Sequence, residues 1–329
     1  SGSKGRLLRD WGLIFACWLP CFLSYYPGIF SYDLPAQTQQ MMGLRTFTAD
    51  NPPLHTLVWG LCLRLQEATG LESLAVYGIG QMLLLSFAMA WCISEFRKAG
   101  CSRGYLIGSL AFFALNPTIA LMSFIPVKDT LFAVFFLLNI LLFLRIYREG
   151  ETQWPAAARW ILTALMCCLL RNNAFLMYVL SLPALLILFP AQWKRTVALT
   201  ALPVMLFAGI HFGLYPAVGI GEGRRKEAMS VPIQQISRIV AEEEEKLSEE
   251  ELAEIGRYFK PEKAKKNYNP RFADPMKKLF SEKELKKSVP AFLDLWWRLV
   301  WKYPATALDA LLDLNLPYWY PDAAAVDAY

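Results

Sequence analysis

Apolar residues run along this chain in long blocks separated by short polar segments. Seven blocks are long enough, or nearly long enough, for helices that cross a bilayer. They fall at residues 11–27, 73–95, 104–124, 130–146, 157–170, 174–190 and 196–216. Several are short, which favours tilted helices or a locally thinned bilayer. Because no strand-like alternation of period two is convincing, the pattern predicts an all-helical membrane protein.

Two further helices are expected between the first and second blocks. Leu34 to Met42 follows Asp33, a residue type that is favoured at helix N-caps. Residues 54–65 are apolar, but a run of about a dozen residues is too short to cross a bilayer comfortably. We expect this second helix to lie in the membrane interface.

Basic residues set the orientation. With residues 54–65 left on the surface, eleven basic residues lie on one side and four on the other, and the positive-inside rule makes the richer side cytoplasmic. The cytoplasmic set is Lys4, Arg6, Arg9, Arg97, Lys98, Arg103, Arg145, Arg148, Arg159, Lys194 and Arg195. The outer set is Arg45, Arg64, Lys128 and Arg171. The amino terminus is therefore predicted to be cytoplasmic.

Composition supports a membrane module followed by a hydrophilic domain. The chain of 329 residues is 55% hydrophobic and 14% aromatic, which is too apolar for a soluble protein of this size. Charge gathers instead after residue 217, so we predict a transmembrane module at 1–217 and a helical extracytoplasmic domain at 218–329. The net charge of +5 is modest and gives no support for nucleic-acid binding.

The hydrophilic domain carries two local signals. Ser248 and Glu251 form a plausible capping box within an amphipathic stretch from Ala241 to Tyr258. The segment from Leu293 to Tyr303 contains three tryptophans with flanking Arg298 and Lys302, which suits a helix resting on the membrane surface.

The remaining composition argues against other classes of protein. The seven cysteines lie mainly in or beside apolar blocks and suit buried small residues better than disulfides or a metal cluster. The first three residues resemble an expression remnant, and we expect no cleavable signal, because no small-residue cleavage site follows the first block. No Gly-rich phosphate loop, zinc spacing or serine-hydrolase elbow occurs, which disfavours ATPases, zinc hydrolases and serine lipases.

Polar residues at the predicted outer face are the candidates for a site. Ionisable groups at that depth are costly, and a functional site is their default interpretation. They are Asp33, His55, Lys128, Asp129, Arg171, Asn172 and Asn173. Structural alternatives exist for several of them: Asp33 can cap the next helix, a lone histidine is more often structural, and Lys128 and Arg171 can extend to the interface. Two cations facing one carboxylate also make a plausible phosphate clamp.

These residues carry a resemblance to a known family. The order of Tyr-Pro-Gly and Asp33, then Asn-Pro-Pro-Leu-His, Lys128-Asp129 and Arg171-Asn172-Asn173, resembles bacterial integral-membrane proteins related to the GT-C glycosyltransferases. Similar segments follow in the hydrophilic domain: Ser230 to Arg238, Tyr268-Asn269-Pro270 through Lys277, and Tyr318 to Pro321. The resemblance implies a seven-span module and a sugar donor linked to polyprenyl phosphate. Members usually continue into further spans, whereas this sequence stops at Tyr329, and a missing carboxy-terminal part would remove some of the acceptor or lipid site.

The resemblance implies a role for Asp33, and the chemistry of the other candidate residues suggests roles for them in the same reaction. By position, Asp33 matches the catalytic acidic residue in the first outer loop of GT-C enzymes and is expected to act as the general base. Lys128 and Arg171 would stabilise the leaving phosphate. His55, Asn172 and Asn173 would contact sugar or phosphate, and Asp129 would position Lys128.

No cofactor is required by this chemistry. Asp33 and Asp129 can together hold a divalent metal ion, although two carboxylates are too few to demand one.

Two alternative functions remain open. A lipid or sugar transporter also uses intramembrane charges, but transporters usually contain paired repeats with broken helices, and none is apparent here. A non-catalytic scaffold whose outer domain binds a partner would use the charges only as anchors. Neither the sugar nor the acceptor, whether glycan, lipid or protein, can be read from the sequence.

Overall fold

The computed structural model describes residues 2–148 and 154–320. Over these residues the chain is helical, and its only strand-like pairs are two isolated bridges, Thr48 with Gly221 and Asn269 with Phe272. The prediction of an all-helical protein is therefore confirmed. The chain divides into two compact units, Ser1–Glu222 and Gly223–Tyr329, whereas the sequence placed a boundary after residue 217.

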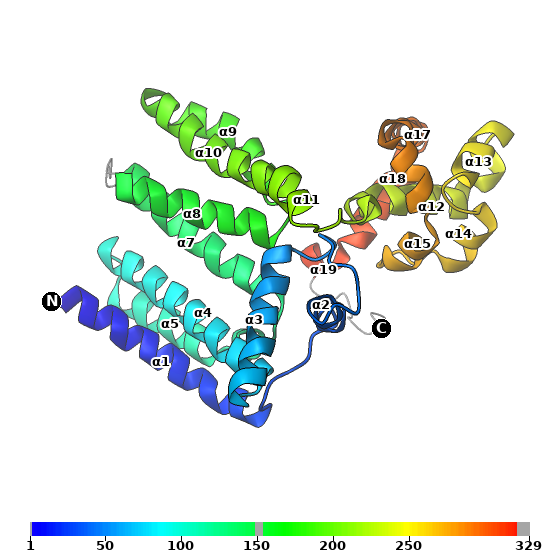
Figure 1. Ribbon diagram of the computed structural model, residues 1–329. Coiled ribbons are helices and arrows are strands. Elements are labelled where there is room, and N and C mark those ends of the chain that lie inside the picture. Colours follow the sequence, from blue (N-terminus) through cyan, green and yellow to red (C-terminus); the bar gives the residue numbers. More distant parts are fainter. Residues whose placement is uncertain (1, 149–153, 321–329) are drawn as a thin grey trace. The chain divides into compact units, whose positions relative to one another are not determined.

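Unit 1 is a bundle of apolar helices. Each predicted block falls on one or more helices. They are α1 (Gly2–Ser24), α4 (Ser73–Lys98), α5 (Arg103–Leu115), α6 (Pro117–Met122), α7 (Lys128–Arg148), α8 (Trp154–Leu170), α9 (Phe175–Leu188) and α10 (Trp193–Ala208), the last continuing through a π-helical turn, Gly209–Leu214, into α11 (Tyr215–Ala217). These helices lie side by side (Figure 1). Along the bundle, α9 packs on α10, α10 on α8, α8 on α7, α7 on α4, α4 on α1 and α1 on α5.

Four helical stretches are long and apolar enough to cross a membrane: Gly2–Ser24, Ser73–Lys98, Lys128–Tyr147 and Pro190–Ala217. The chain is thus a helical membrane protein. Helices α5, α8 and α9 are apolar but shorter, so the seven-span module stays a prediction.

The third predicted span is interrupted. Asn116 ends α5, and its side-chain oxygen accepts hydrogen bonds from the backbone N–H groups of Thr118 and Ile119, which starts α6. Pro117 follows directly and has no N–H to continue the preceding ladder. A single apolar block therefore becomes two helices of 13 and 6 residues.

The two helices expected between the first and second apolar blocks are present as α2 (Leu34–Met41) and α3 (Pro53–Thr69); the chain between α1 and α4 that contains them is called the α1–α4 segment. Helix α3 is longer than the predicted run. Pro53 occupies its first turn, where a missing N–H costs nothing, and Gly70 ends it with φ of 75°. It packs on α2, α4 and α8 and crosses the ends of the bundle helices (Figure 1).

A buried polar cluster joins three apolar helices. Asn139 on α7 donates from Nδ2 to the Trp160 carbonyl oxygen and to Thr163 Oγ1 on α8, both at 3.0 Å. The Tyr178 hydroxyl on α9 donates to Asn139 Oδ1 at 3.2 Å. Such bonds between helices stabilise a bundle whose apolar surfaces alone gain little from meeting each other in lipid.

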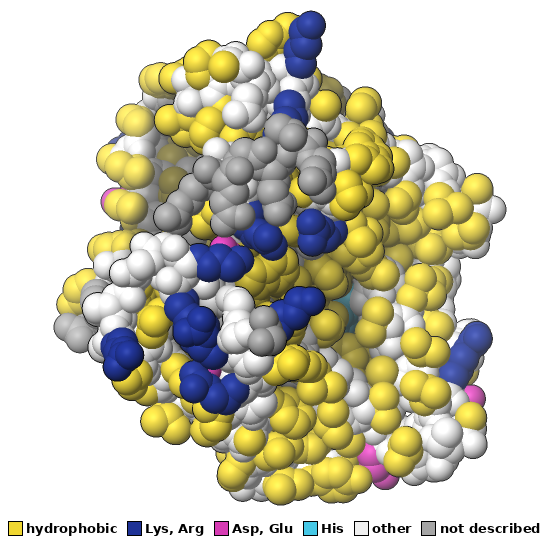
Figure 2. All heavy atoms as spheres, turned by 90° about the vertical axis from the view of Figure 1, so that its left-hand side faces the viewer, with side chains coloured by type: hydrophobic (Ala, Val, Ile, Leu, Met, Phe, Trp, Pro, Cys, Tyr) yellow, Lys and Arg dark blue, Asp and Glu magenta, His cyan; other side chains and the backbone are white. Residues whose placement is uncertain are grey.

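The end of unit 1 that holds the amino terminus is basic. Lys and Arg side chains gather on this face, with few acidic ones (Figure 2). Asp10 is fully buried there between Arg9 at 2.8 Å and Arg97 at 2.6 Å. Arg97 lies in the last turn of α4, so this carboxylate links the first half of α1 to the end of α4.

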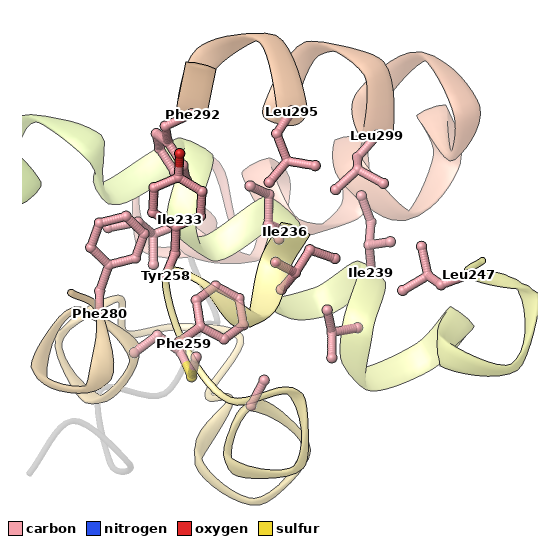
Figure 3. Close-up of a cluster of buried hydrophobic side chains, with 14 of the residues drawn as sticks. Ile233, Ile236, Ile239, Leu247, Tyr258, Phe259, Phe280, Phe292, Leu295 and Leu299 are labelled. Carbon is pink, nitrogen blue, oxygen red and sulfur yellow. The ribbon is translucent and has the colours of Figure 1, made fainter. Parts of the chain in front are cut away.

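Unit 2 is a separate helical domain with its own core. Its helices are α12 (Ser230–Glu243), α13 (Glu249–Gly256), α14 (Pro261–Asn267), α15 (Asp274–Leu279), α16 (Glu282–Lys287), α17 (Val289–Lys302), α18 (Pro304–Leu314) and α19 (Leu316–Trp319). Phe292, Leu295 and Leu299 of α17 point toward Ile233 and Ile236 of α12 (Figure 3). The capping box predicted from Ser248 and Glu251 is confirmed at the start of α13.

Candidate functional site

The candidate residues of unit 1 come together at the end of the bundle opposite the basic face. This end holds the carboxyl ends of α1, α8 and α11 and the amino ends of α4, α7 and α9. Antiparallel packing of successive helices puts these ends on one side. The site is built from α2, α3 and the turns before α7 and after α8.

An ion pair lies at the centre of this end. Lys128 Nζ contacts Asp33 Oδ2 at 2.6 Å, although the two residues are 95 positions apart. Lys128 also donates to Asn51 Oδ1 at 3.3 Å. Both charged side chains keep 22% of their surface exposed. The pair is therefore anchored but open to a ligand.

Asp33 does not act as a side-chain cap. It occupies the N-cap position of α2, but its side chain accepts no hydrogen bond from that helix. The carboxylate turns to Lys128 instead, which removes the capping alternative. The segment is fixed just upstream, where the Ser31 hydroxyl donates to the Pro126 carbonyl oxygen at 2.7 Å. Together with the Lys128–Asp33 contact, this bond holds the loop after α1 beside the start of α7.

His55 lies beneath the pair and is 1% exposed. One ring nitrogen, Nδ1, lies 2.9 Å from Gln37 Nε2, and the other, Nε2, lies 2.9 Å from the Tyr77 hydroxyl. Burial, and secondly the charge of Lys128, lowers the pKa of His55 to about 4, with Asp33 acting in the opposite direction. The imidazole is therefore neutral at neutral pH. Both ring nitrogens of His55 are engaged, so the ring is better placed to hold Gln37 than to contact a substrate. Gln37 lies one helical turn after Asp33.

Asp129, the residue after Lys128, forms a second ion pair. Arg171 Nε contacts Asp129 Oδ1 at 3.3 Å, and both side chains are about half exposed. The guanidinium also lies over the Phe132 ring, 5.7 Å from its centroid. The expected partnership of Asp129 with Lys128 is wrong, because consecutive residues of a helix project in different directions. Each cation instead has its own carboxylate.

Asn172 and Asn173 differ in their surroundings. Asn172 Nδ2 donates to the Ala49 carbonyl oxygen at 3.2 Å, and Asn172 Oδ1 is buried without a hydrogen-bond partner. Asn173 is exposed, and its carbonyl oxygen accepts from the Leu176 N–H at the start of α9. Asn172 thus fastens the α1–α4 segment to the turn after α8, with one acceptor left over.

The α1–α4 segment is also fastened to the carboxyl end of unit 1. The Ala49 N–H donates to the Gly221 carbonyl oxygen at 2.9 Å, and the Gly221 N–H donates to the Phe47 carbonyl oxygen at 2.8 Å. A Cβ at Gly221 would lie 3.3 Å from Thr48 Cγ2, so this close approach favours glycine. Residues 47–49 therefore connect the turn after α8 with the segment that follows α11.

Several residues of the site were not expected from the sequence. Gln37 and Tyr77 hold His55, and Asn51 shares Lys128 with Asp33. Asn51 belongs to the Asn-Pro-Pro-Leu-His segment, and Gln37 lies four positions after Asp33, which places it on the same face of α2. Tyr77 carries no sequence signal, because it sits inside an apolar block.

The carboxylates of the site are paired with cations. Asp33 is held by Lys128, and Asp129 by Arg171. Within residues 2–148 and 154–320, no group of three or more His, Cys, Asp or Glu side chains is arranged to hold a metal ion. The site therefore presents two cations, each beside a carboxylate that is at least partly exposed, a combination suited to an anionic ligand and to proton transfer.

The sequence matches a family of unknown function (DUF6020) over residues 42–325. The chain belongs to this family. The matched range contains every candidate site residue of this family member except Asp33, which precedes it. No curated protein and no solved structure matches the chain.

Proposed function

We propose that this protein is a membrane glycosyltransferase of the GT-C type. It would move a sugar from a polyprenyl-phosphate donor to an acceptor on the outer face of the membrane. The amino terminus would be cytoplasmic and residues 218–329 extracytoplasmic, following the distribution of basic residues. The observation that carries the proposal is the Asp33–Lys128 pair, a partly exposed carboxylate and ammonium at the bundle end opposite the basic face.

The reaction assigns one step to each charged group. The acceptor hydroxyl attacks the anomeric carbon of the donor sugar and forms the new glycosidic bond. Asp33 takes the hydroxyl proton. The bond between the anomeric carbon and the phosphate oxygen breaks, and polyprenyl phosphate leaves with the electron pair. Lys128 and Arg171 stabilise the negative charge that grows on that phosphate.

The ion pairs imply an exchange of partners when the donor binds. A phosphate that contacts Lys128 competes with Asp33 for the same ammonium. Once the phosphate takes over this cation, the Asp33 carboxylate is released for the acceptor hydroxyl. Donor binding and exposure of the base are then coupled through one lysine, with Asn51 as the neighbouring hydrogen-bond acceptor.

The test is sugar transfer in proteoliposomes with a panel of radiolabelled polyprenyl-phosphate sugars. Asp33→Asn keeps the shape of the side chain but accepts no proton, so transfer should fall by about 100-fold or more. Donor binding should change much less. Glu67→Gln, an exposed carboxyl change on α3, serves as the matched control and should leave transfer unchanged.

Two results would contradict the proposal. One is near-normal transfer by an Asp33→Asn protein that elutes as a folded species. The other is movement of the labelled lipid across the bilayer without sugar transfer to any acceptor, which would favour a transporter.

A further inference from the structure

Unit 2 carries a set of large apolar side chains that its own core does not use. They lie on α17, α18 and α19 and are called the α17–α19 surface here. Its members are Trp297, Trp301, Leu308, Leu312 and Trp319. Trp297 and Trp301 are 53% and 68% exposed, and their rings meet edge to face at 5.6 Å. Exposed apolar surface of this kind marks an interaction site.

The helices that present this surface are already packed on their other sides. Phe292, Leu295 and Leu299 fill the core from the opposite side of α17 (Figure 3). On α18, Ala307 and Ala310 are buried, while Leu308 and Leu312, four residues apart, are exposed. The fold therefore does not need the α17–α19 surface for its own stability.

Charges beside the two tryptophans are neutralised within unit 2. Arg298 contacts Glu254 at 2.7 Å and Asp294 at 3.0 Å. Lys302 contacts Glu251 at 2.8 Å. Cations that are already paired offer little to an acidic partner, so the tryptophans dominate what α17 can bind.

The chemistry of the exposed side chains fits a lipid interface. Tryptophan has a large apolar ring and one polar N–H, and it concentrates where acyl chains meet headgroups. Trp319 is held against α18, because its Nε1 donates to the Leu312 carbonyl oxygen at 3.0 Å. Leucines beside tryptophans on an amphipathic helix are typical of helices that lie in the membrane surface.

A bilayer is always within reach of this surface. The last candidate span ends at Ala217, and unit 2 begins at Gly223. Six residues of extended chain cover at most about 20 Å. The membrane that holds unit 1 is therefore present at high local concentration.

We propose that the α17–α19 surface inserts into the interfacial region of the bilayer that holds unit 1. The proposal does not depend on glycosyl transfer. It extends the interfacial helix expected at residues 293–303 to a surface built from three helices.

The test uses the full chain in nanodiscs that contain one copy each. A phospholipid with a photoreactive carbene precursor in its acyl chain should label peptides around Trp297, Trp301 and residues 308–319. A water-soluble carbene reagent should label α14, whose Lys263 and Lys266 are exposed, and largely spare the α17–α19 surface. Strong water-soluble labelling of Trp297 and Trp301 without lipid labelling would overturn the proposal.

A double variant checks that the tryptophans hold the surface in lipid. Trp297→Ser with Trp301→Ser should lower lipid labelling of residues 308–319 by about tenfold, because the apolar area gained on insertion is lost. Lys263→Ser with Lys266→Ser is the matched control and should change nothing. Unchanged labelling in the tryptophan variant would contradict the proposal. So would protection that appears only in nanodiscs with two copies, since that result assigns the surface to a second copy of the chain.

Discussion

At the scale of single residues, His55 links stability to pH. Its pKa lies near 4 in the folded protein because the ring is buried and Lys128 is close, against about 6.5 in an unfolded chain. Between these values the unfolded state binds the extra proton. Stability is therefore complete above pH 6.5 and falls as the pH drops toward 4.

The expected loss attributable to His55 is about 2 kcal/mol between pH 7 and pH 5. Thermal unfolding in detergent over this range measures it. His55→Gln should flatten the profile, whereas Arg64→Gln, an exposed change on the same helix, should keep the wild-type slope. A His55→Gln profile as steep as the wild type would show that the dependence comes from other groups, Asp33 and Lys128 being the charged ones that influence this ring.

Asp10 provides a second prediction, at the basic end of unit 1. Asp10→Ala removes the partner of Arg97 and leaves its guanidinium half-buried without a counter-ion. We expect a loss of about 3 kcal/mol, because breaking a buried pair strands the other charge. Lys98→Gln breaks only an exposed pair within α4 and should cost less than about 0.5 kcal/mol. Equal melting temperatures for the two variants would refute the assigned role of Asp10.

Lys128 and Arg171 can be tested as a pair. If Lys128 and Arg171 contact one donor phosphate, Lys128→Gln and Arg171→Gln should each weaken donor binding by about 10-fold to 100-fold. The double variant should lose less than the product of the single effects, because neighbouring contacts to one ligand are coupled. Binding of the labelled donor to detergent-solubilised protein measures this, with Arg64→Gln as the control. Unchanged affinity for the donor in both single variants would mean that Lys128 and Arg171 only extend to the membrane interface.

At the scale of elements, two glycines on α4 distinguish packing from helix propensity. A Cβ at Gly78 would lie 3.2 Å from Phe124 Cβ and 3.3 Å from the Phe124 carbonyl oxygen. A Cβ at Gly80 would meet nothing within 4 Å. Gly78→Leu should therefore lower stability by about 1–3 kcal/mol or prevent folding, as overpacking does.

Gly80→Leu is the matched control, two residues away on the same helix. It should fold with wild-type yield and melting temperature, as judged by size-exclusion chromatography and thermal unfolding in detergent. Similar losses for both leucine variants would mean that α4 does not approach Phe124 as closely as the structure has it.

The elements also show what the sequence can predict. Apolar block length located the helices well, because a helix in lipid must satisfy its backbone internally and so takes up the whole block. It did not predict the break at Asn116, where a side-chain cap and Pro117 together interrupt an apolar run. Pairing inside the site was predicted less well. Periodicity assigns residues to helix faces, but it does not predict that α7 packs between α4 and α8. This arrangement brings Lys128 to Asp33 and Asp129 to Arg171.

At the scale of the whole molecule, the orientation in the membrane is open to a direct experiment. Native Cys101 lies between α4 and α5 at the predicted cytoplasmic side, and Lys263→Cys places a thiol on exposed α14. In intact cells an impermeant maleimide should modify residue 263 and spare Cys101, as peptide mass spectrometry can show. Both thiols should react after the membrane is opened. Modification of Cys101 alone in intact cells would reverse the topology and remove the outer-face site.

The bridge between the α1–α4 segment and Gly221 has a mechanical consequence. Two backbone hydrogen bonds join residues 47–49 to residue 221, and the chain enters unit 2 only two residues later. A pull on unit 2 is therefore borne first by this bridge rather than by the helix that ends at Ala217. In the α1–α4 segment, Ala49 of the bridge is followed two residues later by Asn51, whose side chain accepts a hydrogen bond from the Lys128 ammonium. Tension on unit 2 would therefore reach the segment that contacts Lys128, the lysine that pairs with Asp33.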